Sequence, residues 1–111
     1  MESYALVFPI LPGKLDEARA FAEELKQRSD EMEASRKRLR VTRESVWVNQ
    51  TPMGDIGVVL LEADDVAGAN RGFAESQEPF DVWFKERAQS FSGIDWSQPV
   101  PMSEVAYDFR F

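Results

Sequence analysis

Four side chains able to bind a polar, flat molecule alternate along one stretch of the sequence. They are Arg43, Ser45, Trp47 and Asn49. Side chains two positions apart share a face of a β-strand, so these four would lie together if the stretch is extended. A guanidinium, a hydroxyl, an indole N–H and an amide can orient an oxygenated aromatic ligand. Arg and Trp are also enriched in protein interfaces, so a dimer interface is the other interpretation.

Two more tryptophans are candidate ligand-binding residues. Trp83 falls in a predicted helix that starts at Pro79, and Trp96 falls in a predicted surface loop over residues 91–101, where a ligand can reach it. The general expectation for bulky aromatic side chains is a place in the core. The strand carboxylates, Glu44, Glu62 and Asp108, are expected to be exposed. The sequence therefore identifies no catalytic residue.

The composition excludes several kinds of chemistry. The chain has no Cys and no His, which removes thiolate metal sites, serine triads and His-ligated haem. No calcium-loop or phosphate-loop motif is present, so we expect neither a metal nor a cofactor. The net charge of -7 argues against nucleic-acid binding. Without a long apolar run or a basic leader, we expect a cytoplasmic protein that does not enter membranes.

One local cluster of positive charge stands out in this acidic chain. Five of the 13 basic residues fall between Arg36 and Arg43. They can end a helix and pair with nearby acids, among them Glu33. They can also form an anion site at the mouth of a pocket, since the guanidinium binds carboxylates bidentately. The spacing leaves both interpretations open.

The remaining patterns predict the elements that position these residues. Two strands over Val41–Glu62 should form a hairpin around Thr51–Gly54. An apolar strand over Tyr4–Leu11 should stop or bulge near Pro9. Helices are expected from Lys14 and after a cap at Asp64–Asp65, besides the one from Pro79. The alternating residues of Ser103–Phe111 predict a last, half-buried strand.

This order of elements predicts one domain, residues 1–111, of the α+β class. Its topology would be ferredoxin-like, βαββαβ, with a four-stranded antiparallel sheet, helices on one face, and the first and third strands in the centre. Helices cover only one face of such a sheet, but both faces of the central strands are apolar. A second copy of the chain is the simplest cover for the other face, so we expect a homodimer.

The chain resembles the dimeric α/β-barrel superfamily, which includes antibiotic-biosynthesis-type monooxygenase domains and stress-responsive barrel proteins. The resemblance rests on Leu11-Pro12-Gly13-Lys14 before an acidic helix start, on Trp47 in the second strand, and on Phe73-Ala74-Glu75-Ser76 followed by Pro79-Phe80. It spans nearly the whole chain. The resemblance implies a homodimeric α/β barrel with an apolar pocket between the sheet and its helices, and it transfers no catalytic residue.

Three hypotheses about function follow. The first is a small homodimer that binds a small apolar or aromatic molecule without catalysis. The second is a cofactor-independent monooxygenase, or a related enzyme of small-molecule metabolism, in which Arg43 and Trp47 position an acidic substrate. The third is a regulatory or structural interaction module.

Overall fold

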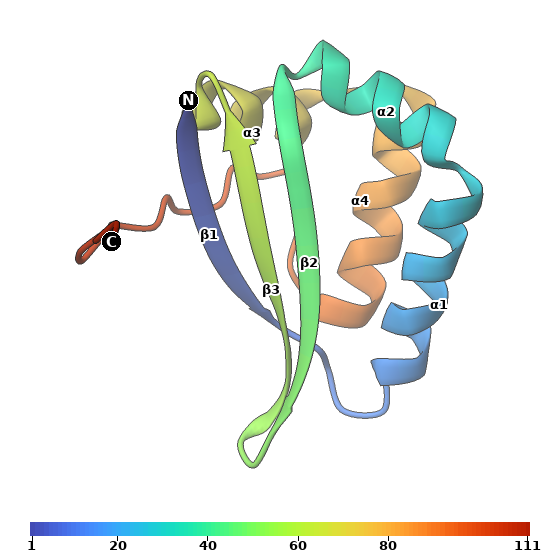
Figure 1. Ribbon diagram of the computed structural model, residues 1–111. Coiled ribbons are helices and arrows are strands. Elements are labelled where there is room, and N and C mark those ends of the chain that lie inside the picture. Colours follow the sequence, from blue (N-terminus) through green and yellow to red (C-terminus); the bar gives the residue numbers. More distant parts are fainter.

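A computed structural model describes the whole chain, residues 1–111. Its elements are β1 (Glu2–Pro9), α1 (Leu15–Gln27), α2 (Ser29–Arg38), β2 (Val41–Thr51), β3 (Gly54–Ala63), α3 (Val66–Glu75) and α4 (Pro79–Ser92). The strands form one antiparallel sheet in the order β1-β3-β2, and the helices cover one of its faces (Figure 1). The α+β class and the one-sided helical layer are confirmed. None of the helices has the length and hydrophobicity needed to cross a bilayer.

The predicted hairpin is confirmed, and it places β3 at the centre of the sheet. Residues Pro52 and Met53 connect β2 to β3. The Thr51 hydroxyl donates to the Gly54 carbonyl oxygen over 2.6 Å and accepts from the Met53 N–H over 3.2 Å. Gly54 has a φ of 123°, a conformation that favours glycine because it has no Cβ. The turn therefore fixes the pairing of β2 with β3, which continues to Ala63.

The helical segment after Lys14 is two helices, not the single long helix that its periodicity predicts. Arg28 interrupts it with a φ of -109° and a ψ of 32°. The Arg28 guanidinium lies 4.1 Å from the ring centroid of Trp83 and binds Glu31 over 2.7 Å. These contacts hold the side chain between α1, α2 and α4. The change of direction lets α1 pack on α4 while α2 reaches β2.

The predicted fourth strand is wrong for the single chain. Residues 103–111 are exposed and make no ladder hydrogen bonds, so the sheet has three strands and β1 is at its edge rather than in its centre. An alternating pattern sets which face a side chain would take, but a ladder also needs a partner strand. Here the chain crosses β1: Pro101 accepts from the Tyr4 hydroxyl over 3.5 Å, and the Ser103 hydroxyl donates to the Ala5 carbonyl.

Polar groups fix the ends of α3 and α4. The Asp65 carboxylate accepts from the Gly68 N–H over 3.0 Å, which confirms the predicted cap at the start of α3. At the other end of α3, the buried Lys85 ammonium donates to the carbonyl oxygens of Phe73, Ala74 and Ser76 over 2.8 to 3.0 Å. A cation at a helix C-terminus satisfies free carbonyls and complements the helix dipole. Lys85 therefore anchors α3 to α4.

The buried apolar residues form two separate clusters between the sheet and the helices. One comprises Phe8, Ile10, Ala18, Phe21, Ala88 and Phe91. The other comprises Tyr4, Ala63, Val66 and Ala69. The two clusters do not merge, and residues from both line the space between them. That space is an apolar cavity.

Candidate ligand-binding cavity

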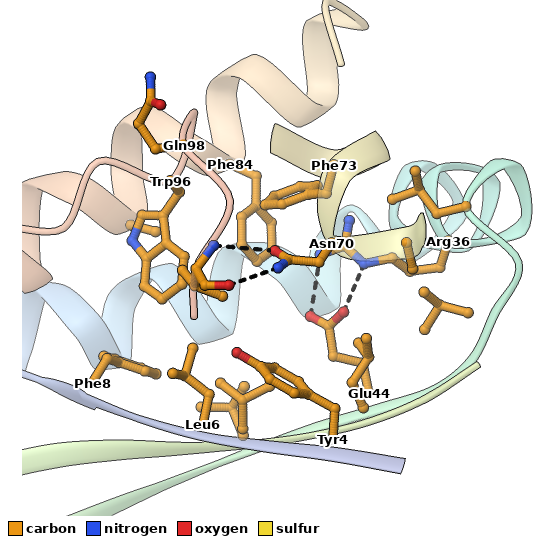
Figure 2. Close-up of a pocket in the computed structure, with 18 of the residues that line it drawn as sticks. Tyr4, Leu6, Phe8, Arg36, Glu44, Asn70, Phe73, Phe84, Trp96 and Gln98 are labelled. Atoms are coloured by element: carbon orange, nitrogen blue, oxygen red, sulfur yellow. Dashed lines mark hydrogen bonds and ion pairs between the residues drawn. The ribbon is translucent and has the colours of Figure 1, made fainter. Parts of the chain in front are cut away.

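A cavity of about 130 Å³ lies between the sheet and the helices, and 15 of its 19 lining residues are hydrophobic (Figure 2). The sheet contributes Tyr4, Leu6, Phe8, Val41, Glu44, Val46, Val59 and Leu61. The helices and the residue after α2 contribute Arg36, Leu39, Ala69, Asn70, Phe73, Phe84, Ala88 and Phe91. The chain after α4 adds Trp96, Gln98 and Val100. Three parts of the fold therefore enclose one mostly apolar space.

The sheet residues that point toward the helices form the floor of the cavity. On β1 and β3 the inward residues pair across the ladder, Tyr4 with Leu61 and Leu6 with Val59. On β2, Val46 also pairs with Val59. Because adjacent positions point to opposite faces, these pairs form continuous rows beneath the helices. The floor is thus a regular aliphatic surface with one phenol ring.

Phe8 is held over the sheet by the absence of a side chain at Gly57. The two residues are paired in the β1–β3 ladder. A Cβ at position 57 would lie 2.0 Å from the Phe8 Cζ atom, so the ring occupies the space that any other residue would need. The Phe8 ring in turn meets Trp96 edge to face, with centroids 5.8 Å apart. Gly57 therefore sets one aromatic corner of the cavity.

The segment after α4 forms a wall, and Asn70 holds it in place. The Asn70 amide nitrogen donates to the Val100 carbonyl over 2.9 Å, and its oxygen accepts from the Val100 N–H over 3.5 Å. At the other end of the wall, the Trp96 indole donates to the Ser92 hydroxyl over 3.0 Å. Figure 2 shows both Trp96 and Asn70 beside the cavity. Hydrogen bonds from α3 and α4 thus hold a segment that has no regular structure of its own.

The charges that face the cavity neutralise each other. Arg36 donates to the two carboxylate oxygens of Glu44 over 2.8 and 3.2 Å, and the side chains are only 10% and 13% exposed. The guanidinium carbon also lies 4.8 Å from the ring centroids of both Phe73 and Phe84. A buried, bidentate pair leaves little unpaired charge for a ligand. The cavity therefore suits an uncharged molecule.

Tyr4 supplies a hydroxyl that stays protonated. Burial raises the pKa of the Tyr4 phenol, because the phenolate is poorly solvated there. Its partner is the Pro101 carbonyl at 3.5 Å, a long hydrogen bond. At neutral pH the group can accept or donate a hydrogen bond at the edge of an apolar ligand.

A second polar cluster, centred on Asp81, lies outside the cavity and joins α4 to α2. Burial alone would raise the pKa of the Asp81 carboxyl. Hydrogen bonds from Ser35 and Ser76, with the charges of Arg36 and Arg38, outweigh burial and hold this pKa below its usual value. The Asp81 side chain is 1% exposed. It links α4 to α2 and so fixes the helix that carries Arg36. No three acidic side chains converge as metal ligands would.

The structure separates the residues predicted from the sequence as ligand-binding candidates. Arg43, Ser45, Trp47 and Asn49 share one face of β2, as predicted, but that face is turned away from the helices and the cavity. Arg43 pairs with Glu62 over 3.4 Å. Trp83 packs between α1 and α4, with its ring 5.4 Å from that of Phe21. Only Trp96 lines the cavity. Ligand binding by all six stays a prediction.

The basic cluster is taken up largely by ion pairs. Arg36 binds Glu44, Lys37 lies 3.0 Å from Glu33, and Arg38 lies 3.5 Å from Asp81. Of these, the exposed Lys37–Glu33 pair adds little stability. These contacts favour the interpretation of helix termination and salt bridging over an anion site.

Sequence reasoning did not name four polar lining residues of the cavity as ligand-binding candidates: Tyr4, Glu44, Asn70 and Gln98. Arg36 also lines the cavity, and it belongs to the basic cluster for which the sequence allowed an anion site. Glu44 alternates with the predicted candidates and so takes the opposite face of β2. A usable signal was present: the outward face of β2 carried the polar run, which left Glu44 and Val46 for the face covered by helices.

Comparison with known proteins places this fold in a class. The chain is similar to the solved structure of tetracenomycin F2 cyclase from Streptomyces glaucescens, a type-II polyketide cyclase, with a TM-score of 0.58 and 19% identity. The match covers 100% of this chain and 99% of that chain. It supports the α+β, ferredoxin-like fold that the sequence resemblance implied. At this identity it shows the fold alone.

The family follows from the sequence itself. The chain belongs to the family of unknown function DUF6176, whose profile matches residues 1–104. Comparison with curated proteins gives no match.

Proposed function

We propose that this protein binds a small, uncharged, apolar or aromatic molecule in the cavity between its sheet and its helices. The observation that carries the proposal is a cavity of about 130 Å³, walled by aromatic and aliphatic side chains, whose charged groups pair with each other. For scale, an engineered apolar cavity of about 150 Å³ binds benzene. A single ring therefore matches the space, and a fused-ring molecule would need the wall at Trp96–Val100 to move.

The polar groups narrow the ligand class further. Tyr4 contributes a hydroxyl at the cavity edge whose one hydrogen bond is long, whereas both polar atoms of Asn70 are bonded to Val100, and the centre is apolar. A ring with one hydroxyl or carbonyl group would bury its apolar part and satisfy its polar atom at this edge. We therefore propose phenols and small aromatic ketones over carboxylates.

A homodimer in the cytoplasm is part of the same proposal. The outer face of the sheet supports it, since Val7 is 59% exposed and Trp47 is 49% exposed, and both pair with Val58 in one row. Large exposed apolar patches typically mark interaction sites. Light scattering at micromolar concentration is expected to give twice the chain mass. A monomer mass there would contradict this part of the proposal and leave cavity binding untouched.

A second candidate is an enzyme that acts on such a molecule without a cofactor, as a monooxygenase or a cyclase. Two observations favour it: the fold is similar to that of a polyketide cyclase, and Tyr4 places a hydroxyl at an apolar cavity where it can polarise a carbonyl. Oxygen uptake or product formation with a panel of phenols, lost in Tyr4→Phe, would establish the enzyme. Binding without turnover would favour the first candidate.

Ligand binding can be tested with a substitution that fills the cavity with a larger side chain from the sheet. Titration calorimetry with phenol, acetophenone and benzoate is expected to detect the first two and not the third. Val59→Phe should weaken binding by about tenfold or more, equivalent to about 1.4 kcal/mol. The matched control is Val58→Phe, the same change one residue earlier on the outer face. Equal effects of the two variants, or no binding by the unaltered protein, would overturn the proposal.

A further inference from the structure

The cavity is open to solvent beside Val46. This residue lines the cavity, yet it is 51% exposed, so the apolar space reaches the protein surface here. Gln98, the other exposed lining residue, is polar. Two residues before Val46, on the same face of β2, Glu44 is covered by Arg36 of α2. Figure 1 shows α2 near the start of β2 and the hairpin turn at the other end of the strand. The cover from α2 therefore reaches Glu44 and leaves Val46 partly open.

Outside this opening the apolar surface continues to Val48 and then stops. Val48 follows Val46 on the same face of β2 and is 39% exposed. Across the ladder Val48 pairs with Gly57, and the Phe8 ring, which also lines the cavity, fills the space over that glycine. The next residue on this face is Gln50, which is polar and exposed. A strip of two valines therefore leads out of the cavity and ends at Gln50.

The register of the sheet sets the direction from the cavity edge to this strip. Tyr4 pairs with Leu61, and the next row of inward residues contains Val59 and Val46. Val48 lies one row further in the same direction. Successive rows are about 7 Å apart, because alternate residues of a strand share a face. A ring that lies along this direction with its oxygen atom at Tyr4 has its opposite carbon, the para carbon, nearest to Val46.

We propose that the ligand is a phenol or aromatic ketone with an unbranched alkyl chain at the para carbon, and that this chain lies on Val46 and Val48. The inference rests on ligand binding in the cavity, as proposed above, and adds the part of the ligand that lies outside it. A chain of about four to six carbons spans the roughly 7 Å between alternate residues of a strand. Covering the two valines removes exposed apolar surface from water, and this burial is the source of the added affinity.

Titration calorimetry with a series of alkylphenols tests the chain directly. The affinity is expected to rise by about two- to fourfold for each methylene between phenol and para-butylphenol, because each one is partly buried on the strip. It should level off beyond para-hexylphenol, where the strip has ended. Ortho-butylphenol has the same apolar area beside the hydroxyl and should bind more weakly than the para isomer.

Two results of this titration would overturn the inference. One is equal affinity for phenol and para-butylphenol, and the other is equal affinity for the two butylphenol isomers. In both cases the binding of phenol would leave the cavity proposal standing. Failure of every compound to bind would overturn the cavity proposal as well.

Variants of β2 test where the chain lies. Val48→Asp places a charge on the strip, so the ratio of the para-butylphenol affinity to the phenol affinity is expected to fall by about tenfold. The matched control is Asn49→Asp, which adds the same charge on the outward face of β2 and should keep the ratio of the unaltered protein. Gln50→Val lengthens the strip and should strengthen para-hexylphenol binding by about threefold.

The outcomes of these variants are independent of one another. An unchanged ratio in a folded Val48→Asp protein would overturn the placement of the chain on the strip, as would the same fall in Asn49→Asp. If Val48→Asp does not fold, the Gln50→Val protein decides: unaltered affinity for para-hexylphenol would overturn the placement.

Discussion

Arg36 from α2 and Glu44 from β2 meet in the lining of the cavity, where two hydrogen bonds of 2.8 and 3.2 Å join them. Two aromatic rings, Phe73 and Phe84, lie 4.8 Å from the guanidinium. The pair therefore does two things. It ties a helix to the sheet, and it keeps the electrostatic potential of the cavity close to neutral.

Removing one partner of this pair should change both stability and ligand choice. Glu44→Gln removes the bidentate partner of a buried guanidinium and leaves it only the more distant Asp81, at 3.9 Å, so we expect a loss of about 3 kcal/mol in the free energy of unfolding. The side of the guanidinium that bound Glu44 should now attract carboxylates, so benzoate binding should appear. Urea unfolding and calorimetry with benzoate measure the two effects. The double variant Arg36→Met/Glu44→Leu should recover stability without binding benzoate; benzoate binding by that variant would show that another cation is responsible.

Of the glycines in the sheet and helices, Gly57 is the one where adding a methyl group is expected to lower the free energy of unfolding most. In Gly57→Ala the new Cβ would overlap the Phe8 ring, and displacing that ring is expected to destabilise the fold by about 1–3 kcal/mol. The ring would also move toward the cavity and reduce phenol binding. Thermal unfolding and titration with phenol check these effects.

The matched control for that change is Gly72→Ala. Its added Cβ would lie 3.0 Å from the flexible end of Leu39, and alanine favours the helix α3. A change near zero is therefore expected in the free energy of unfolding. A Gly57→Ala protein as stable as Gly72→Ala would contradict the close packing of Phe8 on the sheet.

Asp81 should make the protein sensitive to acid. Its pKa in the folded state is lowered, so between that value and the ordinary carboxyl pKa, about 3.9, the unfolded chain binds more protons. The stability that the Asp81 carboxylate contributes therefore rises with pH in this window. This contribution is fully present above the window and is lost as the pH falls through the pKa of the folded state. Asp81→Asn should lower stability at pH 7 and flatten its dependence on pH below about 4.

Urea unfolding at a series of pH values between 2 and 7 would measure this effect. Asp64→Asn, at an exposed position, is the control and should keep the slope of the unaltered protein. An Asp81→Asn protein with an unchanged acid slope would assign the acid sensitivity to other carboxyl groups.

Local patterns in the sequence predicted much of this fold. The Pro52–Met53 turn, the helix cap at Asp65 and the helix start at Pro79 each depend on neighbours within a few residues, and each is found in the structure. The break at Arg28 was not predictable from periodicity, because it depends on contacts with Trp83 on a distant helix. The prediction of a last strand was wrong for a similar reason. Its alternation is present, but pairing depends on an edge outside the segment.

The cavity was harder to predict than the fold. Phe8, Phe91 and the other lining residues are apolar at strand or helix spacing, a pattern that does not distinguish a filled core from a hollow one. The void arises because two alanines, Ala69 and Ala88, occupy helix positions in the lining where larger residues would fill the space. Which alanines face each other is a property of three-dimensional packing. The polar pattern of β2 indicated a site at Arg43 and Trp47, whereas Glu44 and Val46, on the opposite face of β2, line the cavity.

The wall of the cavity and the unpartnered end of the chain are one continuous segment. Val100 is held by Asn70, and three residues later Ser103 reaches the edge of β1. A guest that pushes on Trp96 or Val100 is therefore expected to shift Ser103 on the edge of β1. Reciprocity requires that occupancy of the cavity and attachment of this segment to β1 change each other by the same factor.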